Sequence, residues 1–189
     1  MSDDGDRALF VFDPESSYGM VRQIREAGVM PTPGLRYVAS VTGPWKIFKV
    51  MTQRGSEALA AVGDRLDTPG DPATAMSLGS AQVRRSRYKA HTAFVLIETS
   101  VADPTTLIDQ IAEAIGSDEK PPEIDVVIGD FDILVCVVDD DETALGRKVL
   151  KVREINGVER TKTLRVMDYV STSANAPDDH RVEPAEWES

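Results

Sequence analysis

Apolar residues in the second half of the chain fall into short continuous runs separated by stretches with helical spacing. The run at 93–98 is rich in strand formers and predicts a strand. Asp103 and Pro104 then predict a helix start, with Asp as N-cap and Pro in the first helical position. Apolar residues continue at helical spacing until Gly116, and two further strands are predicted at 124–128 and 133–138.

The turn between these two strands reads Gly129-Asp130-Phe131-Asp132 and predicts an antiparallel hairpin. An acidic run at 139–142 precedes a second amphipathic helix, which Asn156-Gly157 should end. Residues 158–166 predict a fourth strand. The order βαββαβ is that of a ferredoxin-like unit, with four antiparallel strands and both helices on one face.

The first half of the chain repeats this plan, including a second Asp-Pro helix start at Asp13-Pro14 and a second turn at Gly43-Pro44-Trp45-Lys46. Landmarks this regular indicate an internal duplication with one loop insertion. The predicted fold is therefore α+β, with two ferredoxin-like βαββαβ repeats packed sheet to sheet as in a dimeric α/β barrel. The remaining elements predicted in the first repeat are strands at 8–12, 35–41, 47–52 and 73–79, and helices ending at Gly28 and covering 56–66.

These patterns predict four parts of the chain. Residues 7–80 form the first, degenerate repeat, 81–91 a linker, 92–168 the second repeat, and 169–189 a flexible acidic tail. Trp187 is unusual in such a tail and could dock into a groove.

Charge and cysteine content narrow the class of protein. The 189 residues include 21 basic and 32 acidic ones, a formal net charge of −11, and Cys136 is the only cysteine. We read the one basic cluster, 84–89, as a solvated linker, so we expect no direct binding of nucleic acid. With no pair of cysteines and no apolar run of roughly 20 residues, we expect a soluble, cytoplasmic protein without disulfides or membrane contact.

Two stretches of the second repeat have a recognisable pattern, Val126-Val-Ile-Gly-Asp-Phe-Asp-Ile133 and Ile155-Asn-Gly-Val-Glu-Arg-Thr-Lys-Thr163. With these motifs, the repeat resembles the effector-binding (RAM) domain of the Lrp/AsnC regulators over about 75 residues. In that family a Gly-x-x-Asp turn precedes the third strand, and Gly-Val with Thr-x-Thr opens the fourth. The first repeat matches less well, because Lys46 replaces the Asp of the turn.

This resemblance implies association into dimers or larger rings, and binding of an amino acid or similar small effector. It also implies a preceding helix-turn-helix, for which only about six residues are present before the first predicted strand. We therefore expect a regulatory binding and oligomerisation module that does not bind DNA by itself. Its expected partners are a small-molecule effector, further copies of the chain, or another regulator.

The predicted ligand-binding residues each have a simpler structural interpretation. Asp132 could accept an amine of a ligand or brace its hairpin, Asp130 could be a solvated turn residue, and Gly129 could supply a backbone conformation that side chains resist. Thr161 and Thr163 share one side of a strand and could donate hydroxyls to a carboxylate or simply favour β structure. The first repeat contributes Gly43 and Trp45, the latter equally explained as a core anchor.

Catalysis finds little support in the sequence. His91 and His180 lie in the predicted linker and tail, and no nucleophile–base grouping, metal-ligand spacing or phosphate-binding loop is visible. The acidic run 139–142 is explained by a helix start more simply than by a cation site. We therefore expect no enzyme, no catalytic residues, no metal and no cofactor.

Two other functions stay open. One is a cofactor-free enzyme of the dimeric α/β-barrel class, a monooxygenase or an isomerase, for which Trp45, Tyr37 and Asp132 could serve. The other is a scaffold whose pocket is filled by its own side chains. The identity of a ligand does not follow from the sequence.

Overall fold

The computed structural model describes residues 7–12, 20–30, 35–42, 46–51, 74–82, 91–116, 123–172 and 177–184. These residues form strands and helices in two compact units. The first unit comprises Met1–Ser77 and Met167–Ser189, and the second comprises Leu78–Val166. This division differs from the four predicted parts, because the chain returns to the first unit at its C-terminal end.

The second unit has the predicted order of elements. It contains β5 (His91–Thr99), η1 (Pro104–Leu107), α3 (Ile108–Ile115), β6 (Glu123–Gly129), β7 (Ile133–Asp139), α4 (Glu142–Arg153) and the first part of β8 (Val158–Ser171). The strands are ordered β8-β5-β7-β6, and each neighbouring pair is antiparallel. This is the strand order of a ferredoxin-like βαββαβ unit.

Local signals in the second unit act as the sequence predicts. Asp103 is the N-cap of η1, and its carboxylate accepts from the Thr105 backbone N–H at 3.0 Å. The first turn is a 3-10 turn rather than α-helix, and α3 follows directly from it. Asp141 caps α4 by accepting from the Ala144 N–H at 2.7 Å. Each cap satisfies a backbone donor that would otherwise lack a partner at the helix start.

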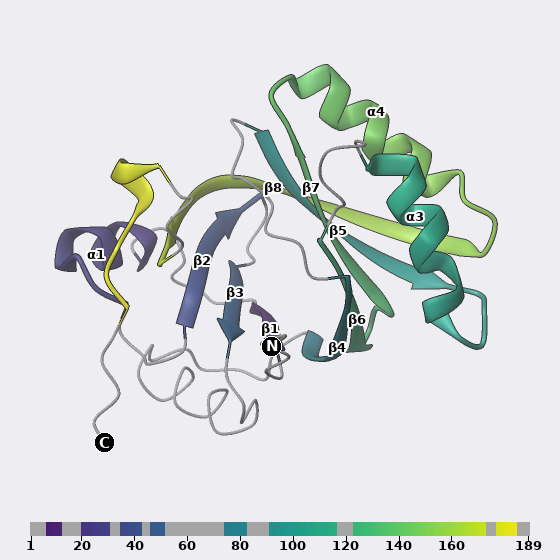
Figure 1. The fold of residues 1–189 in the computed structure, drawn as a ribbon, viewed down its shortest axis with the longest axis horizontal. Coiled ribbons are helices and arrows are strands. Elements are labelled where there is room, and N and C mark those ends of the chain that lie inside the picture. Colours follow the sequence, from purple (N-terminus) through teal and green to yellow (C-terminus); the bar gives the residue numbers. More distant parts are fainter. Residues whose placement is uncertain are drawn as a thin grey trace. The chain divides into compact units, whose positions relative to one another are not determined.

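Both helices of the second unit cover the same face of its sheet (Figure 1). Alternate residues of the strands point to that face and join the helices in one apolar core. The other face of β5 and β7 is buried as well, at Phe94, Leu96 and Leu134. Burial on both faces explains why these strands read as continuous apolar runs. The core on the helix side comprises Ala93, Val95, Ile97, Leu107, Ile108, Ile111, Ile115, Ile124, Ile133, Val135, Val137, Leu145 and Val152.

The first unit contains β1 (Arg7–Phe12), α1 (Met20–Ala27), β2 (Leu35–Val41), β3 (Lys46–Met51) and the beginning of β4 (Thr74–Gln82). Its strands pair antiparallel in the order β1-β3-β2, and Thr74 of β4 lies opposite Val11 of β1. This much agrees with the predicted first repeat. The helix predicted at 56–66, the turn at 43–45 and the helix start at Asp13-Pro14 lie outside the described residues.

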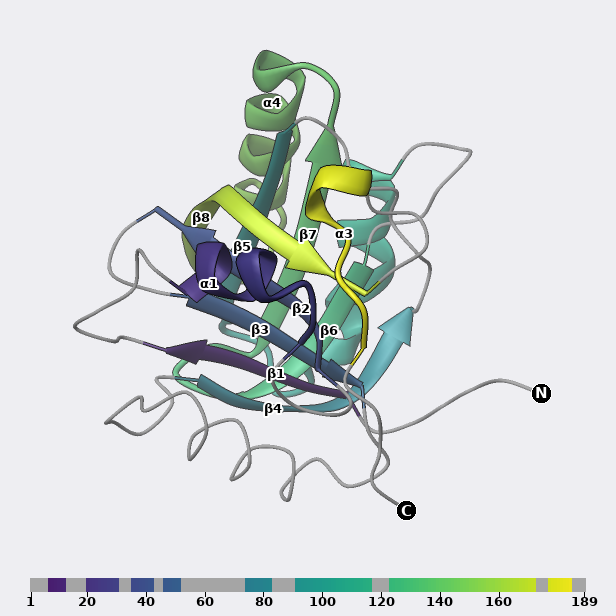
Figure 2. The same ribbon diagram turned by 90° about the vertical axis from the view of Figure 1, so that its left-hand side faces the viewer.

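The C-terminal segment differs from the flexible tail predicted from residue 169. β8 continues to Ser171, and η2 (Asp178–His180) follows beside α1 and the end of β8 (Figures 1 and 2). Val182 is buried, and Glu183 pairs with Val29 through a parallel β-bridge. Trp187, which we predicted could dock, lies outside the described residues.

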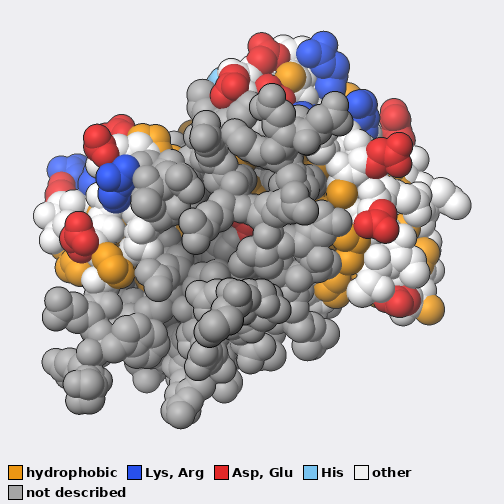
Figure 3. Space-filling model, viewed as in Figure 1, with side chains coloured by type: hydrophobic (Ala, Val, Ile, Leu, Met, Phe, Trp, Pro, Cys, Tyr) orange, Lys and Arg blue, Asp and Glu red, His pale blue; other side chains and the backbone are white. Residues whose placement is uncertain are grey.

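Two further expectations concern charge and membranes. Basic and acidic side chains are interspersed over the described surface that faces the viewer in Figure 3. The basic cluster at 84–89 lies outside the described residues. Within the described part of the chain, no helix has the length and apolar character needed to span a bilayer.

Gly157 allows a direct test of the predicted end of α4. Its φ is +98°, and an added Cβ would lie 2.9 Å from Val101 Cγ1. We expect Gly157→Ala to lower the free energy of unfolding by roughly 1–3 kcal/mol, because alanine is both strained and crowded there. The measurement is the midpoint of urea unfolding.

Gly146 provides the matched control. It lies within α4, is exposed, and has open space where a Cβ would be. Gly146→Ala should therefore raise the free energy of unfolding by about 0.5–1 kcal/mol, since alanine favours the helix. Equal effects of the two substitutions would contradict this account.

Candidate functional site

Three aromatic rings stack on one another in the first unit. The ring of Tyr169 on β8 lies 5.4 Å from that of Tyr37 on β2, with 22° between the planes. The ring of His180 lies 4.3 Å from that of Tyr169, with 12° between the planes. Tyr37 and Tyr169 are 3% and 8% exposed. The stack therefore fixes the plane of His180 against two rings that are themselves held in the core.

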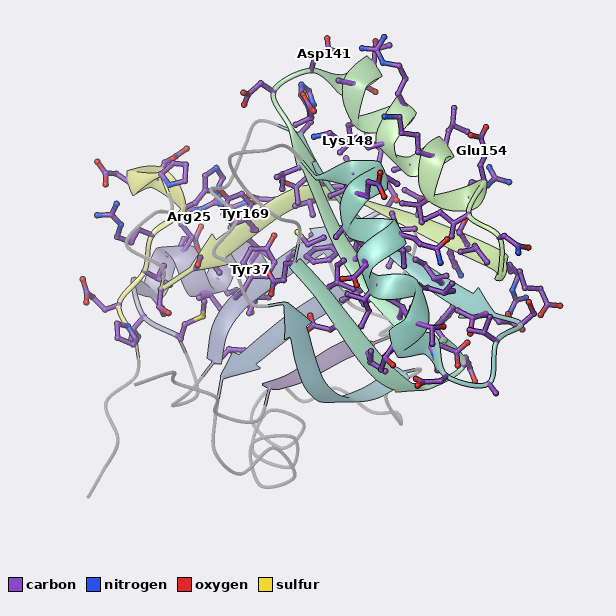
Figure 4. All side chains as sticks on the ribbon, turned by 45° about the vertical axis from the view of Figure 1, so that its right-hand side comes forward. Arg25, Tyr37, Asp141, Lys148, Glu154 and Tyr169 are labelled. Atoms are coloured by element: carbon purple, nitrogen blue, oxygen red, sulfur yellow. The ribbon has the colours of Figure 1, made fainter. Side chains whose placement is uncertain are left out.

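Arg25, in the last turn of α1, connects the helix to this stack (Figure 4). Its Nη2 atom donates to Asp168 Oδ1 at 2.5 Å and to the Tyr169 carbonyl oxygen at 3.1 Å. The same nitrogen lies 3.1 Å from His180 Nδ1. One guanidinium group thus meets a carboxylate, a carbonyl and an imidazole.

Hydrogen-bond chemistry assigns the tautomer of His180. Its Nδ1 lies 2.9 Å from the Tyr169 carbonyl oxygen, which can only accept, so a hydrogen bond forms here when Nδ1 carries the proton. The two hydrogens on Arg25 Nη2 are taken by Asp168 and the same carbonyl. In the neutral ring, the free lone pair is therefore on Nε2.

Two carboxylates flank the imidazole. Asp168 Oδ1 lies 3.7 Å from Nδ1, and Asp179 Oδ2 lies 3.5 Å from Nε2. The side chain of His180 is 25% exposed, so Nε2 belongs to a partly buried ring that solvent still reaches. A ring that has taken up a proton at Nε2 is positively charged and lies between the negative carboxylates of Asp168 and Asp179. The positive guanidinium of Arg25 repels that charge.

Backbone pairing brings His180 to this place. The Val182 N–H donates to the Ser171 carbonyl at 3.1 Å, and the Glu183 N–H donates to the Gly28 carbonyl at 3.0 Å. The Met30 N–H returns a bond to the Glu183 carbonyl at 2.9 Å. Gly28 ends α1 with φ +73°, a conformation that favours glycine and turns the chain toward this pairing.

The phenol of Tyr169 differs chemically from the imidazole. Burial, together with the negative charges of Asp179 and Asp168, raises the pKa of Tyr169 to about 12, while Arg25 acts in the opposite direction. The hydroxyl therefore keeps its proton at neutral pH and can donate but not act as a base.

The predicted ligand-binding residues of the second repeat occupy other positions. Gly129 is the last residue of β6, and Asp130 is exposed in the turn. Asp132 Oδ2 accepts from the Thr99 backbone N–H at 2.7 Å and from Thr99 Oγ1 at 3.0 Å. These contacts match the alternative in which Asp132 braces its hairpin.

Thr161 and Thr163 lie on β8 opposite Ile97 and Val95 of β5. Directly opposite residues of antiparallel strands point to the same face. The two threonines therefore point to the same face of the sheet as Ile97 and Val95, and Thr163 is exposed there. The Asp132 N–H donates to the Ile97 carbonyl from the turn before β7, while Thr161 lies opposite Ile97 on β8. Gly43 and Trp45 lie outside the described residues.

The acidic run before α4 is accounted for by partners within the unit. Asp139 pairs with Lys148 at 2.8 Å, which holds the pKa of this carboxyl below its usual value, and Glu142 pairs with Arg165 at 2.6 Å. Asp141 caps the helix (Figure 4). Among the residues that the structure describes, no group of three or more His, Cys, Asp or Glu is arranged to hold a metal ion.

Sequence reasoning named Tyr37 among candidates for the enzyme alternative but missed Arg25, Tyr169 and His180. Asp168 and Tyr169 lie 143 and 144 positions from Arg25, and His180 lies 155 positions from it. The one available signal was the apolar Val182 in an otherwise polar segment. A single apolar residue does not specify where a segment docks.

The described elements form an α+β fold of antiparallel strands and helices. No family model matches the chain, and no curated protein matches it in sequence. Among solved structures, a mutant chlorite dismutase from Candidatus Nitrospira defluvii is similar at a TM-score of 0.55 and 11% identity, over 87% of this chain and 91% of its own.

Weaker similarities extend to two further structures. A putative monooxygenase from Fusobacterium nucleatum subsp. nucleatum has a TM-score of 0.49 and 10% identity, over 92% of this chain and 97% of its own. An anthrone oxidase-like protein has a TM-score of 0.41 and 11% identity, over 94% and 98%.

The similarity to chlorite dismutase corrects one expectation. We predicted from the sequence that the chain is not an enzyme, and this was wrong, because the fold it shares is one on which an enzyme is built. None of these similarities identifies an Lrp/AsnC effector domain, amino-acid binding or a regulatory role, so these stay predictions.

Asp132 offers a test between bracing and ligand binding. Asp132→Ala removes both hydrogen bonds to Thr99, and we expect it to lower the free energy of unfolding by about 1–3 kcal/mol. Asp130→Ala, at the exposed turn position, should change it by less than about 0.5 kcal/mol. Urea unfolding measures both, and an Asp132 variant as stable as the parent would refute the bracing role.

The raised pKa of Tyr169 predicts that the folded protein becomes less stable at alkaline pH. The folded chain holds the phenolic proton more tightly than the unfolded chain, because the pKa is raised from 10.0 to about 12. The stabilisation that this tighter proton binding gives the folded chain is fully present below pH 10 and is lost as the pH rises toward 12. Relative to Tyr169→Phe, the parent should lose on the order of 2 kcal/mol across this window, by urea unfolding at several pH values. Parallel declines in both proteins would show that Tyr169 is not responsible.

Proposed function

We propose that this chain is a cofactor-free enzyme of the α+β-barrel class, with His180 as the general base that takes a proton from a small organic substrate. The observation that carries the proposal is the orientation of the imidazole. Nδ1 is fixed as a donor to the Tyr169 carbonyl, which leaves Nε2 as the accepting atom.

The surroundings of His180 support proton transfer. Stacking on Tyr169 limits rotation of the ring, so the direction of the Nε2 lone pair is set before a substrate arrives. Asp168 and Asp179 lie within 3.7 Å of the ring nitrogens and would favour the imidazolium formed by the reaction. The Tyr169 hydroxyl, protonated at neutral pH, does not compete as a base.

The first step is the same for both activities named by the sequence alternative. A C–H or O–H bond of the substrate breaks, its proton moves to Nε2, and the electron pair stays on the substrate as an anion. In an isomerase the proton returns at a different carbon. In a monooxygenase the anion passes electrons to the co-substrate, molecular oxygen, and its carbon forms a C–O bond. The O–O bond then breaks as the same carbon loses its second proton, which leaves a carbonyl group and releases the other oxygen atom with two protons as water.

The finer fold belongs to the same proposal. We take both halves to be ferredoxin-like repeats, which the strand order of the second unit and the β1-β3-β2 order of the first support. Sheet-to-sheet packing of the two repeats stays a prediction.

A panel of compounds with acidic C–H or O–H bonds, such as 1,3-diketones and polycyclic phenols, tests the function. Deuterium exchange followed by NMR detects proton abstraction, and an oxygen electrode detects monooxygenation. We expect His180→Asn to reduce the rate about 10²–10⁴-fold, since Asn can still donate to the Tyr169 carbonyl but has no Nε2.

His91→Asn is the matched control, because His91 starts β5 in the second unit and takes no part in the cluster. Its rate should equal that of the parent. An unchanged rate in His180→Asn, or no turnover by the parent across the panel, would overturn the proposal.

A further inference from the structure

The candidate base lies on a short segment that is attached to the first unit by few contacts. We define residues 177–184 as the C-terminal strap. Three backbone hydrogen bonds join the strap to the rest of the unit, through Val182 N–H, Glu183 N–H and Glu183 carbonyl. Val182 is the one buried residue of the strap, at 5% exposure.

Side-chain contacts of His180 add to this attachment, since its Nδ1 lies 2.9 Å from the Tyr169 carbonyl oxygen and 3.1 Å from Arg25 Nη2. Further polar contacts form within the strap. Asp178 pairs with Arg181 at 3.2 Å, and His180 N–H and Arg181 N–H donate to Pro177 and Asp178 carbonyls. These bonds shape the strap without attaching it. A segment with little buried apolar surface and few attaching hydrogen bonds opens more readily than a core strand.

The strap also joins two elements that meet at the site. Glu183 pairs in parallel with Val29, just after α1, while Arg181 pairs in parallel with Ser171 at the end of β8. Arg25 belongs to α1, and Asp168 belongs to β8. Docking of the strap therefore coincides with the meeting of His180, Arg25 and Asp168.

We propose that the C-terminal strap is a detachable switch that assembles the site when it docks and removes His180 from Tyr169, Asp168 and Arg25 when it opens. Its effect on turnover rests on the proposed function, whereas its docking does not. An opened strap leaves Tyr169 and the Arg25–Asp168 pair in place without the proton acceptor.

Amide hydrogen exchange of the full chain tests detachment. In the parent protein, the N–H groups of Met30, Val182 and Glu183 should exchange at least about 100-fold faster than those of Phe94 and Val135 in β5 and β7. Equal protection of the two sets would overturn the proposal, because the strap would then open only with the whole fold.

Val182→Asp tests the coupling to the site, because it places a carboxylate where a buried apolar side chain docks. We expect exchange at Met30 and Glu183 to rise at least about tenfold while β5 and β7 stay protected. The ¹⁵N spectrum of the His180 ring should lose the single Nδ1–H tautomer and become a mixture. Retention of that tautomer would overturn the proposal.

Arg181→Ala is the control within the strap, since this side chain is exposed and forms an ion pair with Asp178, which also belongs to the strap. It should leave the exchange of Met30 and the His180 tautomer unchanged. If Val182→Asp also speeds amide exchange in β5 and β7, the whole fold is disturbed, and Val182→Ala is used in its place. The same change in the His180 tautomer is then expected. Turnover of the substrate panel is measured separately. If the strap opens as expected but the protein turns over none of the compounds, the switch is supported and the proposed reaction is refuted.

Discussion

Arg25 Nη2 is the atom on which the geometry of the candidate site depends. It reaches from α1 to the Asp168 carboxylate and the Tyr169 carbonyl on β8, and it lies against the His180 ring. By using both of its hydrogens on oxygen atoms, it leaves the imidazole nitrogen to donate rather than accept. The position of one guanidinium group thus favours the tautomer of His180 in which Nδ1 carries the proton.

The ion pair that Arg25 forms is partly solvated, with 36% and 38% of the two side chains exposed. A pair of this kind contributes little to stability, because water screens it and holding the side chains costs entropy. Its physical effect is orientation. The stack of Tyr37, Tyr169 and His180 and the burial of Val182 remove apolar surface from water and provide the attachment.

Local chemistry made much of the fold predictable. The caps at Asp103 and Asp141 and the positive φ of Gly157 depend on neighbouring residues, which a linear pattern contains. The site could not be predicted in this way, because Arg25 and His180 meet only after the chain has folded back. Residues 177–184 are mostly polar, and polarity alone does not separate a docked segment from a free one.

Asp132 shows why the family resemblance predicts architecture better than activity. Its carboxylate binds the end of β5 at Thr99, while its N–H donates to Ile97 and its carbonyl accepts from Val127. Through these contacts to three residues of neighbouring strands, Asp132 holds the hairpin in its position against β5. A Gly-x-x-Asp turn can therefore recur wherever such a hairpin meets β5, whatever the protein binds. The motif that carried the resemblance is thus a signal of the fold, and function has to be argued from the atoms around His180.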